Sequence, residues 1–207
     1  MFVLTLIARQ ESADLSALQA RLNQMAPTLP FTQTYPDELQ GAFELAEPAL
    51  SALLLAARQG DCWLGLGVGQ LTLPRFGAAL GQLSIEEATG PARAYSRAAV
   101  EQAQTGAPPR AVDVQGADAE LAAQVTGALR LLYRVVSART PAEWRVLDLL
   151  LPGVRGQQKA VAQALGISSQ AVSKTLVRSL WHEELAARPL ILSALQNLDA
   201  AGSEKRP

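Results

Sequence analysis

The segment from Gln157 to Leu176 carries the residue pattern with the most specific chemistry in this sequence. Apolar residues at helical spacing lie on both sides of Gly166, which falls where a tight turn between two helices requires a positive φ. Ser168 follows the turn and can cap the second helix. This spacing predicts a helix-turn-helix that binds double-stranded DNA, although helical hairpins with a glycine at the turn also occur in unrelated bundles.

The side chains that face outward from this motif are polar or cationic, as contacts to base edges and phosphates require. The residues that we expect to face the bases are Ser169, Gln170, Ser173 and Lys174, with Ser168 at the start of the second helix. The residues that we expect to contact phosphates are Arg155, Lys159 and Arg178. The motif therefore offers both kinds of contact that sequence-specific binding needs.

Charge is distributed unevenly along the 207 residues, although the net charge is only −1. Residues 1–129 contain 7 Lys or Arg against 13 Asp or Glu, whereas residues 130–190 contain 9 against 4. An acidic body joined to a basic module is expected when one domain contacts phosphates and the other does not. Two domains that attract each other would produce the same asymmetry, so the charge pattern supports DNA binding only in combination with the motif.

Further helices should place this motif within an all-α domain over residues 139–198. Thr140 can cap a helix that has Pro141 in its first turn and Glu143 in position for a capping box. After the motif we expect another helix, broken near Pro189 and then resumed, rather than the paired strands of a wing. Residues 199–207 are polar and are expected to form a disordered tail.

A long helix is expected over residues 117–138, between this domain and the N-terminal half. Apolar residues recur along it at spacings of three and four, which is typical of a heptad seam: Leu121, Val125, Ala128, Leu132 and Val135. The seam could join two copies of the chain, or it could pack the helix on its own sheet. A homodimer is expected in either case, because two recognition helices must reach successive major grooves about 34 Å apart.

The first 116 residues alternate between strand and helix patterns. The expected elements are strand 2–7, helix 14–25, a hairpin of 31–35 and 39–45, a helix from residue 48, strand 63–69, helix 90–100 and strand 111–114. Glycines at alternate positions of strand 63–69 should let another backbone pack close to it. The order of elements predicts an α+β domain, a ferredoxin-like or cyclase-like sandwich, followed by the all-α domain.

Three stretches of this half resemble the SatD family. They run from Pro36 to Phe43, from Leu64 to Gly69 and from Gly90 to Arg97, and they read PDELQGAF, LGLGVG and GPARAYSR. That family resembles nucleotidyl cyclase and GGDEF domains in its N-terminal half and usually ends in a helix-turn-helix. The resemblance therefore implies a cyclase-like domain and a DNA-binding module in one chain.

The residues at the cyclase-type metal positions depart from that pattern. Such enzymes hold two metal ions with an aspartate at the end of the first strand and an acidic residue at the hairpin turn. Here Ala8 and Arg9 stand where the aspartate would be, and only Asp37 and Glu38 remain at the hairpin. We therefore expect no catalytic residues, no metal and no cofactor, and we expect Arg9 to pair with Asp37 or Glu38.

A small-molecule or nucleotide effector is still compatible with this half. Arg93 and Arg97 lie one turn apart on the expected helix 90–100 and could hold an anion. The candidate effector or anion site then consists of Arg9, Asp37, Glu38, Arg93 and Arg97. A solvated helix face, on a domain that serves only for dimerisation, is the alternative explanation.

Other classes of site have little support in the sequence. Cys62 is the only cysteine and His182 the only histidine, so an intrachain disulfide, a thiolate metal site and a serine-histidine triad are not expected. No apolar run reaches the roughly 18–20 residues of a membrane span, and the N-terminus lacks the basic leader of a signal peptide. We expect a cytoplasmic protein without membrane contact, in which Cys62 is buried and inert.

Together these patterns favour a homodimeric transcriptional regulator whose N-terminal domain serves assembly or effector sensing. The rival interpretation is a metal-dependent enzyme that makes or breaks a nucleotide messenger, with the helix-turn-helix as a targeting module. A third interpretation is an adaptor whose helical module binds a partner protein instead of DNA.

Overall fold

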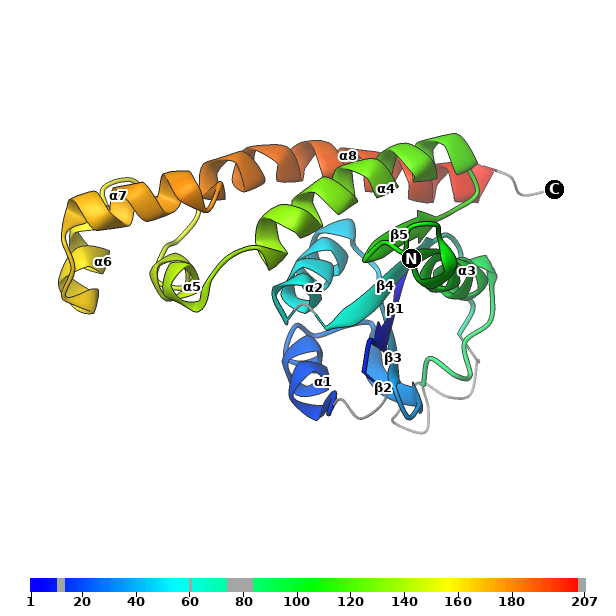
Figure 1. Ribbon diagram of the computed structural model, residues 1–207. Helices are drawn as coiled ribbons and strands as arrows, with labels where there is room; N and C mark the ends of the chain where they lie inside the picture. Colours follow the sequence, from blue (N-terminus) through cyan, green and yellow to red (C-terminus); the bar gives the residue numbers. More distant parts are fainter. Residues whose placement is uncertain (11–13, 60, 74–83, 205–207) are drawn as a thin grey trace.

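The computed structural model describes residues 1–10, 14–59, 61–73 and 84–204, which form an α+β chain with a helical arm extending from one side (Figure 1). The strands are β1 (Phe2–Ala8), β2 (Leu29–Tyr35), β3 (Glu38–Phe43), β4 (Cys62–Val68) and β5 (Val112–Gln115). The helices are α1 (Ser16–Asn23), α2 (Ala46–Gln59), α3 (Pro91–Thr105), α4 (Ala119–Ser137), α5 (Pro141–Leu147), α6 (Gln158–Leu165), α7 (Ser169–Arg178) and α8 (Trp181–Glu204).

The strands form one mixed sheet in the order β2-β3-β1-β4-β5. β1 lies between β3 and β4 and pairs antiparallel with both, whereas β5 is added at the edge in parallel with β4. β2 and β3 form an antiparallel hairpin, so β1 and β2 run in the same direction with β3 between them. The central position of β1 explains its nearly continuous apolar sequence, because both of its faces are covered.

Helices cover both faces of the sheet: α1, α2 and α4 lie on one face and α3 lies on the other (Figure 1). Successive residues of β1 point to opposite faces. Leu4 enters the large core beneath α2 and α4, whereas Thr5 donates a hydrogen bond to Ser96 of α3 at 3.0 Å. The second half of α8 packs on α4 and α2 and adds Leu195 and Leu198 to the same core. The C-terminal helix is therefore part of what stabilises the N-terminal sheet.

Glycines in β4 allow α3 to lie unusually close to the sheet. A Cβ atom on Gly67 would be 2.1 Å from the carbonyl oxygen of Ala92, and one on Gly65 would be 2.4 Å from backbone atoms of Ser96 and Val100. The backbone of α3 thus occupies the space in which a side chain would stand. This contact confirms the prediction that these glycines let another backbone approach.

The apolar seam of α4 packs within the chain. Of the predicted seam, Val125 and Leu132 are buried in the core shared with α2, α8 and the sheet, Leu121 and Ala128 pack against that core, and Val135 is half-buried. Leu131, on another side of the helix, is 73% exposed. Of the two interpretations of this seam, packing on its own sheet is the one observed for Leu121, Val125, Ala128 and Leu132.

α8 is one continuous helix with Pro189 inside it, so the expected break near this residue is wrong. Pro189 has no N–H, which leaves the Leu185 carbonyl without its intrahelical partner at a cost of about 3 kcal/mol. Beyond the proline, Ile191, Leu195 and Leu198 are buried. Each contributes roughly 1.5–3 kcal/mol, so burial of this face outweighs the loss of one hydrogen bond.

Most of the expected disordered tail is helical and forms the last turns of α8. Residues 199–204 are helical rather than disordered, and residues 205–207 lie outside the described residues. Asp199 forms an ion pair with the N-terminal amine of Met1 at 2.7 Å. Within the described part of the chain, neither α8 nor any shorter helix combines the length and apolar character needed to cross a membrane.

We expect Gly67→Ala to lower the free energy of unfolding by roughly 1–3 kcal/mol or to prevent folding, because the new methyl group would overlap backbone atoms of α3. Urea unfolding followed by circular dichroism measures the effect. Gly127→Ala is the matched control: it lies in α4 with no atom within 4 Å of the added Cβ, so it should be neutral or stabilising by about 1 kcal/mol. Equal stability of Gly67→Ala and wild type would contradict the close packing of α3 on β4.

Candidate functional site

The helices α5, α6 and α7 form the end of the arm, away from the sheet (Figure 1). They enclose a small apolar core of their own, to which Val146, Leu147, Val161, Val172 and Leu176 contribute. Because Val172 and Leu176 are one helical turn apart, α7 buries a single stripe and turns its other sides outward.

The turn between α6 and α7 has the local geometry that the sequence predicts. Gly166 ends α6 in the left-handed region with φ 64°, a conformation that glycine adopts without strain. Ser168 Oγ accepts a hydrogen bond from the Ala171 N–H at 3.1 Å and so caps the first turn of α7. The turn and the cap together fix the direction in which α7 leaves α6.

The polar residues expected to contact DNA lie mainly on the exposed sides of this unit. Ser169, Gln170 and Lys174 are exposed and Ser173 is half-buried. We call these four residues the α7 polar face. Arg155, before α6, and Lys159, within it, are also exposed.

Arg178 differs from the other cations expected to contact DNA, because it has a partner within the chain. Its Nε lies 2.7 Å from Oε1 of Glu143, while the side chain as a whole remains 70% exposed. The other carboxylate oxygen of Glu143 accepts a hydrogen bond from the Thr140 N–H at 2.7 Å, and Thr140 Oγ1 accepts one from the Glu143 N–H. Arg178 thus joins the end of α7 to the capping box of α5 and keeps only part of its guanidinium free for another anion.

A buried ion pair attaches the arm to the rest of the chain. Arg139, in the link between α4 and α5, and Glu184 of α8 approach to 2.5 Å, with side chains only 2% and 4% exposed. The Nε of Arg139 also donates a hydrogen bond to the Ser179 carbonyl at 2.9 Å, just beyond α7. Glu184 has a second cation, Arg188, at 2.5 Å. One arginine therefore ties the start of α5 to the end of α7 and to α8.

A second contact joins the arm to α2 through Trp144. The guanidinium of Arg58 lies 4.2 Å from the centre of the Trp144 ring and makes two hydrogen bonds to Asp148, at 2.7 and 2.8 Å. The guanidinium of Arg139 lies 5.1 Å from the same ring centre. The position of α5 against the body is therefore set by charge and ring contacts as well as by apolar packing.

The predicted effector residues are only partly brought together. Glu38 is buried and forms an ion pair with Arg97, and it also accepts a hydrogen bond from Thr34. Arg97 in turn lies 5.1 Å from the centre of the Tyr35 ring. Arg97 is therefore held by groups of the hairpin itself, which argues against a free anion site at this position.

Arg93 likewise donates its hydrogen bonds to other groups of the chain. Its Nε donates to the amide oxygen of Gln40 at 3.1 Å, and its Nη1 donates to the carbonyl of Glu86 at 2.9 Å. The Gln40 amide nitrogen donates to Thr5, which donates to Ser96. This buried network holds α3 over the sheet, so Arg93 serves packing rather than ligand binding.

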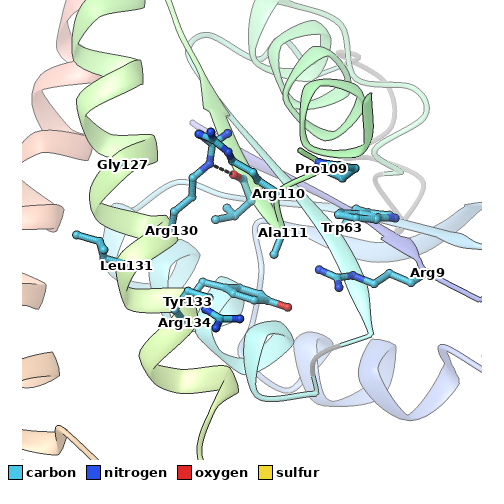
Figure 2. Close-up of a pocket in the computed structure, with 11 residues that line it drawn as sticks. Arg9, Trp63, Pro109, Arg110, Ala111, Gly127, Arg130, Leu131, Tyr133 and Arg134 are labelled. Carbon is cyan, nitrogen blue, oxygen red and sulfur yellow. Dashed lines mark hydrogen bonds between the residues drawn. The ribbon is translucent and has the colours of Figure 1, made fainter. Parts of the chain in front are cut away.

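Arg9 does not pair with Asp37 or Glu38, and that expectation is wrong. Its guanidinium lies 4.2 Å from the centre of the Trp63 ring, next to a cavity beside α4 (Figure 2). Two facts account for this: Glu38 is already neutralised by Arg97, and Trp63 lies on β4 near the end of β1, opposite Ile7. The cation–ring contact is available to Arg9 without burying its charge.

The reactivity of Cys62 bears on whether the described residues offer a nucleophile or a metal ligand. Cys62 is buried, as expected, and burial raises the pKa of its thiol to about 11. The described residues contain no group of three or more His, Cys, Asp or Glu side chains placed to hold a metal ion. A thiol with such a pKa is almost wholly protonated at neutral pH and is a poor nucleophile.

Comparisons of the chain with protein-family models, with curated proteins and with solved structures returned no match. The case for a function therefore depends on two surfaces of the chain itself. One is the α7 polar face with the cations next to it, and the other is the cavity beside Arg9.

We expect Glu143→Gln to lower the free energy of unfolding at neutral pH but not in acid. The hydrogen bond from the Thr140 N–H, opposed in part by burial and aided by Arg178, lowers the pKa of the Glu143 carboxyl below its ordinary value of 4.5. A depressed folded-state pKa gives stability that is present above the ordinary value and is lost as the pH falls through the folded value. Urea unfolding at a series of pH values should show the wild-type advantage disappearing in acid; a constant difference would contradict this role for the charge.

Arg139→Met should lower the free energy of unfolding by about 3 kcal/mol, because it leaves Glu184 buried without its main partner. The double variant Arg139→Met with Glu184→Leu removes both charges and should recover most of that loss. Urea denaturation of both variants measures the two values. A single variant as stable as wild type would show that the pair does not hold the arm in place.

Proposed function

We propose that this chain is a DNA-binding transcriptional regulator in which α6, the turn at Gly166 and α7 form a helix-turn-helix. The observation that carries the proposal is the α7 polar face, which lies at the far end of the arm (Figure 1). Its residues follow the Ser168 cap, so they occupy the N-terminal part of α7, the part of a recognition helix that reaches base edges.

Each side chain of this face has a suitable partner in the major groove. The amide of Gln170 can accept and donate together, which matches N6 and N7 of adenine, and Lys174 can donate to O6 and N7 of guanine. Ser169 and Ser173 can bond either to bases or to phosphates. Arg155, Lys159 and the free part of Arg178 then contact the flanking phosphates and fix the register of α7 on the duplex.

We infer that the N-terminal half is a ferredoxin-like domain with one added edge strand. The strand order β2-β3-β1-β4 and the β1-α1-β2 connection around β3 support this inference. Membership of the SatD family, a cytoplasmic location and a homodimeric state accompany the proposal as predictions. In this scheme the N-terminal domain serves assembly or effector sensing, and the dimer surface lies outside the buried seam of α4.

The enzymatic alternative has less support. Of the two carboxylates at the hairpin, Glu38 is paired with Arg97 and bonded to Thr34, which leaves Asp37 as the remaining acidic candidate. Metal-dependent turnover of ATP or GTP that disappears in Asp37→Ala would favour that alternative over the proposal.

The DNA-binding proposal predicts different outcomes for two kinds of variant. Lys159→Ala should weaken binding to all duplexes and lower the slope of affinity against salt concentration by about one. Gln170→Ala should instead relax preference at one base pair, at a cost of roughly 1–3 kcal/mol for the preferred site. Arg21→Ala, which removes an exposed cation from α1, is the matched control and should change neither.

The duplex for these titrations comes from selection of bound sequences from random DNA by the full chain. Enrichment of a palindromic site would support both DNA binding and a two-fold symmetric dimer. No enrichment, or equal effects of Lys159→Ala and Arg21→Ala, would overturn the proposal and favour a protein-binding adaptor.

A further inference from the structure

A cavity of about 580 Å³ lies at the end of the sheet where β1 ends and β4 and β5 begin, and α4 forms its outer wall (Figure 2). We call it the α4–β5 cavity. Its polar and aromatic lining residues are Arg9, Trp63, Arg110, Arg130, Tyr133 and Arg134. Its volume falls within the roughly 300–1,000 Å³ typical of sites for small molecules.

The lining of the α4–β5 cavity is strongly cationic. Four arginines from three separate parts of the chain face it, and none of the described residues that line it is acidic. Within the described part of the chain, only Arg130 among these four forms an ion pair, with the largely buried Asp113 at 2.5 Å, and Arg110 lies near enough to interact with the same carboxylate. The Nε of Arg130 also donates a hydrogen bond to the Val112 carbonyl at 2.9 Å. Several guanidinium groups around one cavity repel one another, and a bound anion would relieve that repulsion.

The cavity also has a polar aromatic wall. Tyr133 is only 6% exposed, and its hydroxyl points toward the guanidinium of Arg9 (Figure 2). The guanidinium of Arg9 stacks on the Trp63 ring, 4.2 Å from its centre, which keeps that cation beside the cavity. An anion between Arg9 and Arg134 could therefore accept hydrogen bonds from both guanidinium groups and from the phenol.

We propose that the α4–β5 cavity binds a small phosphorylated molecule through its phosphate groups. A phosphate offers three acceptor oxygens and more than one negative charge, which matches several guanidinium forks better than a single carboxylate does. Arg110 is the cation available at the β5 end of the cavity, where Arg130 is already bonded to Asp113 and to the Val112 carbonyl. Arg9 and Arg134 are available at the other end, so a molecule with two linked phosphates offers an anionic group to each end. This site differs from the one expected at Arg93 and Arg97, where both cations are already occupied, because Arg110 and Arg134 form no ion pair among the described residues.

The cavity lies directly beside the attachment of the arm. Arg134 also lines a second hollow with Arg139, Thr140, Glu143 and Arg178, the residues that join α4, α5 and α7. A ligand that holds Arg134 would therefore act next to the base of the arm. A regulatory role for such a ligand rests on the proposed DNA-binding function, but the binding site itself does not.

The test is calorimetric titration of the full chain, without DNA or divalent metal and at constant ionic strength, with pyrophosphate, adenosine 5′-diphosphate and adenosine as probes. We expect pyrophosphate and adenosine diphosphate to bind one per chain and adenosine to give no signal. Arg110→Gln and Arg134→Gln remove exposed side chains and should each weaken pyrophosphate binding about tenfold, the loss of one charge-assisted contact. Arg21→Gln, an exposed cation on α1, is the matched control, and thermal unfolding of each variant confirms its fold.

The outcomes distinguish recognition of the phosphate groups alone from recognition of a whole nucleotide. Equal affinity for pyrophosphate and adenosine diphosphate would show that the phosphates alone are recognised, and tighter binding of the nucleotide would show that a ring contributes as well. Absence of binding by both phosphate probes, equal binding of adenosine, or an equal loss in Arg21→Gln would overturn the proposal. So would a loss of duplex affinity in Arg134→Gln as large as that in Lys159→Ala, since it would assign these arginines to DNA.

Discussion

The buried pair of Arg139 and Glu184 is the interaction on which the arrangement of the arm depends. Two charges removed from water are stable only when each meets the other and their remaining hydrogen-bonding groups find partners. Arg139 meets this condition in part by bonding to the Ser179 carbonyl, and Glu184 by contacting Arg188 as well, while Nη2 of Arg139 and Oε2 of Glu184 have no hydrogen-bond partner. Arg139 follows α4, Ser179 follows α7, and Glu184 and Arg188 belong to α8, so these three segments must meet in one geometry for the charges to be tolerated. The contacts of this ion pair therefore set the position of the α7 polar face.

Local patterns in the sequence predicted most of the elements but not how the arm is attached. The capping box at Thr140, the turn at Gly166 and the cap at Ser168 depend on neighbours within four residues, so each could be identified from spacing alone. Arg139 and Glu184 are separated by 45 positions, and no local rule relates them. Arg9 was assigned to the wrong partner for the same reason, because the pairing of Glu38 with Arg97 depends on α3 crossing the sheet. The continuity of α8 through Pro189 was missed because a buried face can outweigh a local preference.

The excess of Lys and Arg over Asp and Glu in residues 130–190 suggests a basic arm, but not all of these cations are exposed there. Three of its cations form ion pairs within the segment: Arg139, Arg178 and Arg188. Two others, Arg130 and Arg134, line the α4–β5 cavity rather than the arm. The cations exposed near the α7 polar face include Arg155, Lys159 and Lys174. Net charge therefore overstates the positive charge that the arm exposes, because part of it is paired within the chain and part lies at the α4–β5 cavity.

The unbroken course of α8 gives the molecule a mechanical property. Its 24 residues make a rod about 36 Å long, with one end embedded in the core of the sheet and the other beside α7. A tilt of about 5° at the embedded end would carry the far end through roughly 3 Å. Small repacking around Leu195 and Leu198 would thus be amplified into a larger displacement of the helices at the end of the arm. In this arrangement α8 transmits a movement of its packed end, in the sheet domain, to α7 at its other end.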